Sequence, residues 1–266
     1  MGSIVDRLSA EDIRAGLRTQ LIGRDVVYLP EVASANDVAR RLAEEGAAEG
    51  TLVVADYQAA GRGRLGRRWQ APPGSSLLLS LLFRPSLAPD RVQGLTMVLG
   101  LAVADAVGAQ TGLEVGLKWP NDVVIDGRKA GGILVEVALR GSEVDYVVAG
   151  MGLNVNLDPG GLDTGLLVPA TSLSQALGRP VPRLPLLLAL LEAVEQRYLA
   201  LCGGHSPHRE WAARLTTLGQ RVSVSGSGER LEGVAEGVTP GGALQVRRDD
   251  GRLETVLAGD VSLRSG

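Results

Sequence analysis

Apolar residues recur along the chain in two spacings, one typical of strands and one typical of helices. Short apolar runs bounded by turn residues predict buried strands at 51–58, 75–85 and 145–157. Longer apolar or periodic segments predict helices at 37–45, 91–111, 182–202 and 207–215. The stretch 116–139 predicts a strand, a turn at Asp126–Gly127, and a second strand opened by Gly131 and Gly132.

The two ends of the chain differ from this central pattern. Residues 1–30 predict one short amphipathic helix, with Ser9 and Glu11–Asp12 near its start, followed by a linker. From about Leu218 the segments are short and alternating, separated by SGSG, TPGG and DDG, which predicts a small antiparallel barrel. We therefore expect two domains, 1–217 and 218–266. The larger should be α+β with a mixed, mostly antiparallel sheet, because its strands adjoin each other and are mixed with helices.

Composition narrows the classes of function. With 266 residues, 45% of them hydrophobic, the chain can bury a substantial core. A formal net charge of -3 disfavours general DNA or RNA binding, so any positive patch must be local. The single cysteine excludes an internal disulfide, and with no secretory segment evident we expect a cytoplasmic protein. The apolar run at 184–191 is too short to span a bilayer, so no membrane partner is expected.

The stretch GRGRLGRRWQ, at 61–70, matches the letters of the dinucleotide motif G-x-G-x-x-G. That motif requires a helix opening on its glycines, and Pro72, Pro73 and Gly74 prevent one here. What remains is a glycine loop carrying four arginines beside Trp69, which indicates binding of carboxylate or phosphate by a loop that can order around its ligand. A solvated basic turn is the simpler alternative.

A second cluster lies in KWPND…GRKAGG. Lys118, Asn121 and Asp122 flank Pro120, which stiffens the turn. The Asn–Asp pair is suited to holding Mg²⁺ and a phosphate oxygen, and Lys129 to placing a point charge on a phosphate. The alternative is a hairpin with Asn–Asp in a tight turn and exposed lysines.

Two further groups of residues carry similar alternatives. In GMGLNVN, Gly150 and Gly152 indicate close backbone approach, and Asn154 is a polar group inside an apolar strand. It binds either a ligand or a structural partner. Ser34 and Asn36 precede the helix at 37–45, where such residues are usually caps.

Five stretches together resemble biotin–protein ligases, which attach biotin to carboxylase carrier domains. They are SAND at 34–37, DYQAAGRGRLGRRW at 56–69, KWPNDVVIDGRKAGGILVE at 118–136, GMGLNVN at 150–156 and PATSL at 169–173. They occur in the family's order, and the resemblance extends from about residue 25 to the end. It implies a catalytic domain of the biotin–lipoate ligase fold, related to class II synthetases, at 1–217, and an SH3-like β-barrel at 218–266.

The resemblance also implies roles for individual residues. Biotin would be bound by Ser34, Ala35, Asn36, Gln58, Gly61, Arg62, Gly63, Arg64, Trp69, Lys129 and Gly132. ATP and the adenylate would be bound by Arg64, Arg67, Trp69, Asn121, Asp122, Lys129 and Asn154, with Asp122 on Mg²⁺. Lys129, Arg62 and Arg64 would be the catalytic residues, and the loop at 157–170 would cover the adenine. Ala35 stands where the family usually has Thr, so one hydrogen bond worth about 0.5–1.5 kcal/mol is missing or supplied by backbone.

The implied activity is ATP-dependent formation of biotinyl-5′-AMP, followed by transfer of biotin to a carrier-domain lysine. ATP and Mg²⁺ would be required, with no tightly bound cofactor. No DNA-binding function is expected, because a winged helix-turn-helix would need about twice the length of residues 1–30. A homodimer and the identity of the carboxylase stay open. The alternatives are a lipoate–protein ligase and a non-catalytic biotin-binding regulator.

Overall fold

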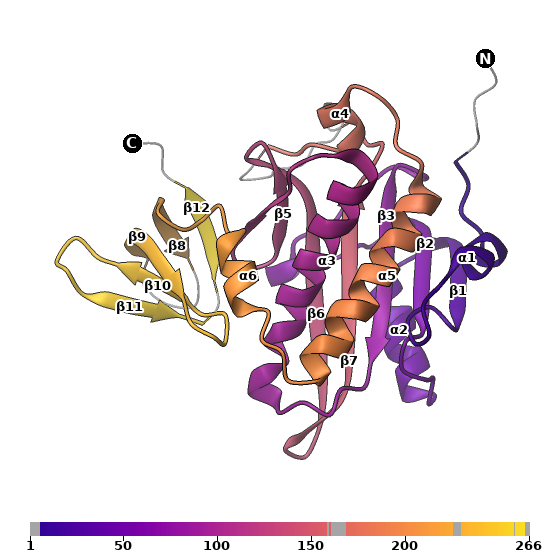
Figure 1. Cartoon of the computed structure of the whole chain (residues 1–266), viewed down its shortest axis with the longest axis horizontal. Coiled ribbons are helices and arrows are strands. Elements are labelled where there is room, and N and C mark those ends of the chain that lie inside the picture. Colours follow the sequence, from indigo (N-terminus) through magenta and orange to yellow (C-terminus); the bar gives the residue numbers. More distant parts are fainter. Residues whose placement is uncertain (1–5, 159, 161–168, 226–229, 258, 264–266) are drawn as a thin grey trace.

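A seven-stranded mixed sheet and a separate five-stranded sheet organise the chain (Figure 1). The computed structural model describes residues 6–158, 160, 169–225, 230–257 and 259–263. The large sheet has the order β1-β2-β3-β7-β6-β5-β4, and β1 with β2 is its one parallel pair in the described residues. Its strands are β1 Val26–Val32, β2 Leu52–Gln58, β3 Ser76–Phe83, β4 Gly116–Lys118, β5 Asp122–Ile125, β6 Arg128–Arg140 and β7 Glu143–Asn154. The predicted α+β class with a mostly antiparallel sheet is confirmed.

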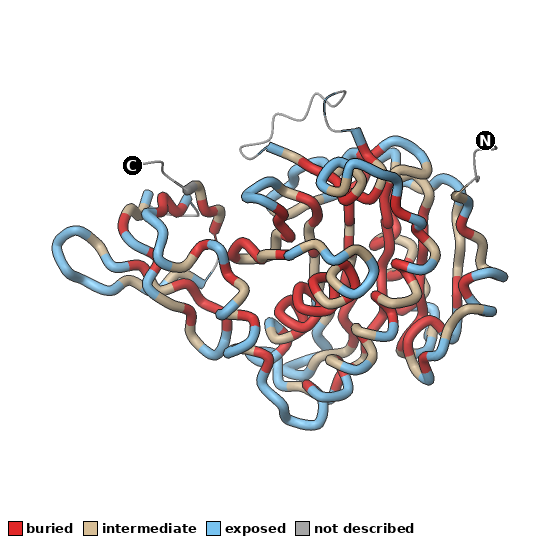
Figure 2. The backbone as a smooth tube through the Cα atoms, turned by 45° about the horizontal axis from the view of Figure 1, so that its top comes forward, coloured by how far each residue is buried: buried red, intermediate tan, exposed pale blue. Residues whose placement is uncertain are grey.

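Helices cover both faces of the large sheet. The helices are α1 Ala10–Gly16, α2 Ala35–Glu44, α3 Gln93–Thr111, α4 Leu173–Leu177, α5 Arg183–Cys202 and α6 His208–Ala213. The long helices α3 and α5 lie side by side on one face, and α2 packs on the other through Ala35, Ala39 and Ala43 (Figure 1). Every residue of β3 is buried because the central strand is covered from both sides, as the buried centre of Figure 2 shows.

The helix α3 is nearly uniformly apolar. With the turn before it, Pro89–Thr111, it is the one described helix long and apolar enough to cross a membrane by length and composition. However, 72% of its most apolar window is buried inside the protein. It packs against the large sheet, α5 and α6, which is the environment of a core helix.

Several predicted elements are corrected by the structure. Residues 26–30, predicted as linker, belong to β1, Val26–Val32, which pairs in parallel with β2. An edge strand pairs on one side only, so it tolerates a proline and half-exposed side chains. For this reason Pro30 and the half-buried pattern of β1 give little strand signal in the sequence. The segment 116–139 contains an additional short strand, β4, and Gly131 and Gly132 lie inside β6 rather than at its start. The helix α4 was not predicted, and it is only five residues long.

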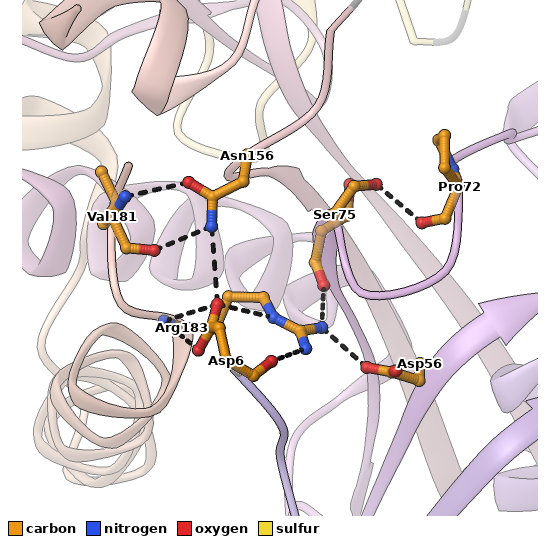
Figure 3. Close-up of polar contacts among 8 residues, drawn as sticks. Asp6, Asp56, Pro72, Ser75, Asn156, Val181 and Arg183 are labelled. Atoms are coloured by element: carbon orange, nitrogen blue, oxygen red, sulfur yellow. Dashed lines mark hydrogen bonds and ion pairs between the residues drawn. The ribbon is translucent and has the colours of Figure 1, made fainter. Parts of the chain in front are cut away.

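A buried arginine ties together the ends of several strands. The Arg183 side chain, 1% exposed, donates to Asp6 and Asp56 and to the Ser76 carbonyl (Figure 3). Nearby, the Asn156 amide bridges the backbone N–H and C=O of Val181 at 2.9 Å each. The start of α5, the N-terminal segment and the ends of β2, β3 and β7 are thereby joined behind the pocket described below.

The C-terminal segment forms an antiparallel sheet of order β11-β10-β9-β8-β12. Its strands are β8 Arg221–Ser225, β9 Leu231–Val238, β10 Leu244–Arg247, β11 Leu253–Val256 and β12 Asp260–Leu263. Pairing of β11 with β12, which would close a barrel, is absent from the described residues, so the SH3-like barrel and the boundary near 217 stay predictions. This sheet contacts the larger part through Trp119, whose indole N–H donates to the Gly242 carbonyl at 2.8 Å.

Candidate active site

One pocket gathers most of the residues singled out in the sequence. It opens on the α2 side of the large sheet. The predicted site residues that line it are Ser34, Asn36, Gln58, Arg62, Gly63, Arg64, Arg67, Trp69, Asn121, Asp122, Lys129 and Gly132. Ala35, Gly61 and Asn154 do not line it. The predicted loop at 157–170 lies largely outside the described residues.

Glycines make a depression in the sheet at the base of this pocket. Gly150, Gly152 and Gly132 belong to the central strands β7 and β6, in opposed or alternate positions on one face. A Cβ on Gly150 would lie 2.2 Å from Asn36 Oδ1, and one on Gly152 would lie 2.6 Å from Trp69 Cε2. Larger residues would therefore expel the side chains that now cover this floor.

The glycine–arginine segment folds back on itself rather than opening a helix. Gly63 N–H donates to Arg67 O at 2.7 Å, and Trp69 N–H to Gly61 O at 2.9 Å. Between these bonds lies a single 3₁₀ turn, Arg64–Gly66. Rejection of the dinucleotide turn therefore agrees with the structure. The loop places Trp69 over Gly152 and Gly132, where its indole N–H is buried without a hydrogen-bond partner among the described residues.

Carboxylates at the α2 end of the pocket hold Arg62. Its guanidinium donates to both oxygens of Asp37, at 2.5 and 2.6 Å, and lies 3.8 Å from Glu136. The hydrogen bond from Arg62 lowers the pKa of Asp37, so this carboxylate is charged at neutral pH. Glu136 also accepts from the Asn36 amide at 2.6 Å. The glycine loop is thereby anchored to the helix that carries the SAND motif.

The side-chain amides of Asn36 and Gln58, which were both predicted to bind biotin, form hydrogen bonds with other residues of the protein. Asn36 Oδ1 accepts from the Ser80 hydroxyl at 2.6 Å, and Gln58 Oε1 accepts from the Ala35 N–H at 2.7 Å. The Ala35 backbone thus contacts Gln58, and the effect of the hydroxyl that Ala35 lacks stays a prediction. Ser34 occupies the N-cap position of α2 without a side-chain capping bond, and Asn36 lies inside the first turn. The predicted N-cap position is therefore confirmed for Ser34, although its side chain makes no capping bond, and is wrong for Asn36.

Lys129 and Asp122 form an ion pair at the other end of the pocket, with Lys129 Nζ 2.5 Å from Asp122 Oδ1. Lys129 Nζ is also 5.9 Å from the centre of the Trp69 ring. The Asn121 amide donates to the Ile133 carbonyl, so this residue braces the turn between β4 and β5. Asn154 follows Gly150 and Gly152 at alternate positions of β7 and is buried. Its amide donates to the Thr171 carbonyl at 3.0 Å, and its oxygen has no partner among the described residues.

A metal ion in this pocket would need ligands beyond the protein. No group of three or more His, Cys, Asp or Glu suited to a metal occurs in the described part of the chain. Asp122 supplies a carboxylate in the pocket, which suits Mg²⁺ because this ion is commonly held by one or two carboxylates together with phosphates. The assignment of Asp122 to Mg²⁺ stays a prediction.

Several residues in and around the pocket were given no role from the sequence. Ser80 lines the pocket, and Glu136 lies outside its lining, yet both form hydrogen bonds with Asn36. Lys118, named in the second cluster without a role, and Asp260 also line the pocket. Ser80 lies in an apolar run, and Asp260 comes from the C-terminal sheet, so the motifs gave no signal for them. The alternative that both lysines are exposed is wrong for Lys118, which is 6% exposed.

Comparisons with known proteins bear on this geometry. The profile of the Biotin/lipoate A/B protein ligase family matches residues 29–154, and that of the Biotin protein ligase C terminal domain matches 217–264. A biotin--[acetyl-CoA-carboxylase] ligase of Mycobacterium tuberculosis is 36% identical, covering 96% of this chain and 97% of its own. The chain belongs to the biotin protein ligase family.

Other members of the biotin protein ligase family share most of this chain. The bifunctional ligase/repressor BirA of Bacillus subtilis is 33% identical over 97% of this chain and 79% of its own length. The structure of the biotin protein ligase from Aquifex aeolicus in complex with biotin and ATP superposes with a TM-score of 0.76 at 29% identity. That match covers 91% of this chain and all of the Aquifex chain. The resemblance stated from the motifs is confirmed.

Proposed function

We propose that this chain is an ATP-dependent biotin–protein ligase that makes biotinyl-5′-AMP and transfers biotin to a lysine of a biotin carboxyl carrier domain. The observation that carries this is the joint lining of one pocket by the glycine–arginine loop, Lys129 and the glycine floor. The glycine floor forms a depression covered by Trp69, and Lys129 lies beside it at Gly132. That arrangement suits an apolar acid whose carboxylate meets a nucleotide phosphate.

In the first step the biotin carboxylate oxygen attacks the α-phosphorus of ATP. A mixed anhydride forms, the bond from this phosphorus to the bridging oxygen breaks, and pyrophosphate leaves. Both reactants are anions, so their approach is opposed unless positive charge surrounds them. Lys129 and Arg64 line the pocket and would supply this positive charge, and Arg62 ties the glycine loop to α2 through Asp37. Mg²⁺, with Asp122 as the proposed ligand, would neutralise phosphate charge when bound.

The second step needs a protected intermediate. The carrier lysine attacks the acyl carbon as a neutral amine, its proton is released, and AMP leaves. Water would attack the same carbon, so a loop that covers the anhydride raises the yield of transfer. The bonds of Gly63 and Trp69 within the loop, and that of Arg62 to Asp37, support this covering role.

The decisive experiment measures pyrophosphate release with Mg-ATP and either biotin or lipoate. We expect release with biotin, and labelling of the lysine when a biotin carboxyl carrier domain is added. Release with lipoate alone would select the lipoate–protein ligase alternative. Binding of biotin without any release would select the non-catalytic regulator.

A further inference from the structure

A buried guanidinium lies outside the pocket and has no part in the chemistry proposed above. Arg183 is the first residue of α5, where the N-terminal end of the helix dipole opposes a positive charge. Its side chain is 1% exposed, so burial opposes the charge as well. Two carboxylates, those of Asp6 and Asp56, compensate this charge. Neither the helix nor the core gains from the cation, so its role lies in the groups that its hydrogen bonds join.

The glycine–arginine loop, residues 59–75, leaves the large sheet at the end of β2 and returns to it at the start of β3. The described pairing of these two strands ends at Ala55 and Leu78, although β2 continues for three more residues. Beyond that point the Gly74 N–H donates to the Asp56 carbonyl at 3.3 Å, which is long for such a bond. The two strands therefore form a fork, and both ends of the loop lie at its mouth.

Arg183 closes this fork with one nitrogen atom. Its Nη1 donates to Asp56 Oδ1 at 2.7 Å and to the Ser76 carbonyl at 3.2 Å (Figure 3). Asp56 lies shortly before the loop, and Ser76 follows it directly. Hydrogen bonds from an ionised donor are stronger than the neutral bonds of a strand ladder. Both ends of the loop are thereby fixed to the start of α5.

The two ends of the loop lead directly to the pocket. Gln58, two residues after Asp56, accepts from the Ala35 N–H and lines the pocket. At the other end, the Ser75 carbonyl accepts from the Asn156 N–H at 2.7 Å, just beyond β7. Parting of these ends would displace the loop from the pocket that it covers.

We propose that Arg183 and Asp56 are positioning residues for retention of the adenylate. Together they clamp the fork of β2 and β3, so that the glycine–arginine loop orders over the adenylate without its ends parting. This inference rests on the proposed function, in which the loop protects the anhydride from water. Without the clamp the adenylate escapes, and water attacks its acyl carbon to give biotin and AMP. Pyrophosphate is then released without labelling of the carrier lysine.

The test compares Asp56→Ala with Asp6→Ala, because each removes one carboxylate from Arg183 and leaves the other in place. The readout is the ratio of pyrophosphate released to carrier lysine labelled. For Asp56→Ala we expect this ratio to rise at least about fivefold, since a charged hydrogen bond at the fork is lost. Asp6→Ala should leave the ratio unchanged. Partial unfolding lowers both quantities alike, so it does not alter the ratio.

Asp56→Asn is the conservative variant, since its amide oxygen still accepts a hydrogen bond from Arg183. Its ratio should lie closer to that of the unmodified protein than to that of Asp56→Ala. An equal rise for Asp6→Ala and Asp56→Ala, or no rise for Asp56→Ala, would overturn the clamp.

A second measurement reports on the loop without requiring any activity. Trypsin cuts after arginine, and the loop contains four of them: Arg62, Arg64, Arg67 and Arg68. Without ligand, Asp56→Ala should be cut within the loop at least about fivefold faster than Asp6→Ala, because an unclamped loop opens more often. If Asp56→Ala fails to fold, Asp56→Asn against Asp6→Asn gives the same comparison with a smaller expected difference. Equal cleavage within the pair would refute the clamp.

Prepared biotinyl-5′-AMP separates the clamp from the proposed function. It should protect the loop of the unmodified protein from trypsin, and protect that of Asp56→Ala less. An unmodified protein that releases no pyrophosphate and gains no protection from the adenylate would contradict the proposed function. Faster cleavage of unliganded Asp56→Ala than of Asp6→Ala would still support the clamp in that case.

Discussion

The substitution Gly152→Ala tests whether Trp69 lies against the glycine floor as the functional cover of the pocket. A Cβ at residue 152 would stand 2.6, 2.7 and 3.0 Å from Trp69 Cε2, Cζ2 and Nε1. Carbon atoms in contact stay about 3.4 Å or more apart, so the ring must retreat by about 0.8 Å. The Trp69 backbone is held to the loop, because its N–H donates to the Gly61 carbonyl at 2.9 Å.

The ring must therefore lift away from the sheet and carry the loop with it. Overpacking of this kind costs about 1–3 kcal/mol. If that cost falls on the closed loop, biotin affinity drops by about five- to 150-fold, since 1.4 kcal/mol is tenfold. The affinity is measured by titration calorimetry with biotin, and folding by thermal unfolding.

Gly108→Ala is the matched control, because it lies inside α3 and its new Cβ would have Leu113 O at 3.8 Å as its nearest neighbour. It should leave biotin affinity unchanged and stabilise the helix by up to about 1 kcal/mol. In a Trp69→Ala background, Gly152→Ala should cost nothing further, since the clash is gone. Biotin affinity of Gly152→Ala within twofold of the unmodified protein would refute the proposed position of the ring.

Four other substitutions have defined outcomes. Arg64→Gly should weaken retention of the adenylate, so that a bystander protein rich in lysine becomes biotinylated; retention equal to the unmodified protein would show that the loop does not guard the intermediate. Lys129→Gln should lower the rate of pyrophosphate release by about 10²–10³ without lowering the unfolding temperature, because a positioned charge is lost from the reacting centre; a drop limited to KM would argue against that role. Arg183→Met should destabilise the fold by about 3–5 kcal/mol in urea unfolding, since two carboxylates lose their buried partner, and a change below 1 kcal/mol would contradict this. Burial raises the pKa of Glu195, but hydrogen bonds from three backbone N–H groups lower it further, so that its pKa lies below the ordinary value. Glu195→Gln should therefore cost about 1–2 kcal/mol of unfolding free energy at pH 7, and progressively less as the pH falls below 4.5 through the lowered pKa. An equal cost at neutral and at acidic pH would refute this linkage.

Local chemistry in the sequence was enough to propose the reacting groups, and their roles stay predictions. The prolines after Gly66 excluded a helix, and that exclusion separated the glycine–arginine loop from a dinucleotide turn. The apolar runs located β2, β3 and β7, because a strand covered on both faces must be continuously apolar. The motifs also supplied the family, since their residues carry chemistry that few other chains combine.

Other features depended on distant partners. β1 is a strand because β2 lies beside it, and neither Pro30 nor its half-polar pattern announces that. Asn36 does not cap its helix, because its side-chain amide accepts a hydrogen bond from Ser80 on β3 and donates one to Glu136 on β6. The roles of such residues depend on partners that are distant in the sequence. The spacing of apolar residues along the chain does not reveal those partners.

The sequence by itself determined which residues are proposed to carry the chemistry and where the strongly apolar strands and helices run, because propensity, turn residues and apolar spacing are local properties. The tertiary structure alone decided that Lys118 is buried rather than exposed, and that Asp260 neutralises Arg67. Burial and ion pairing depend on which strands become neighbours. That choice is made by packing of the whole sheet and of the C-terminal strands against it.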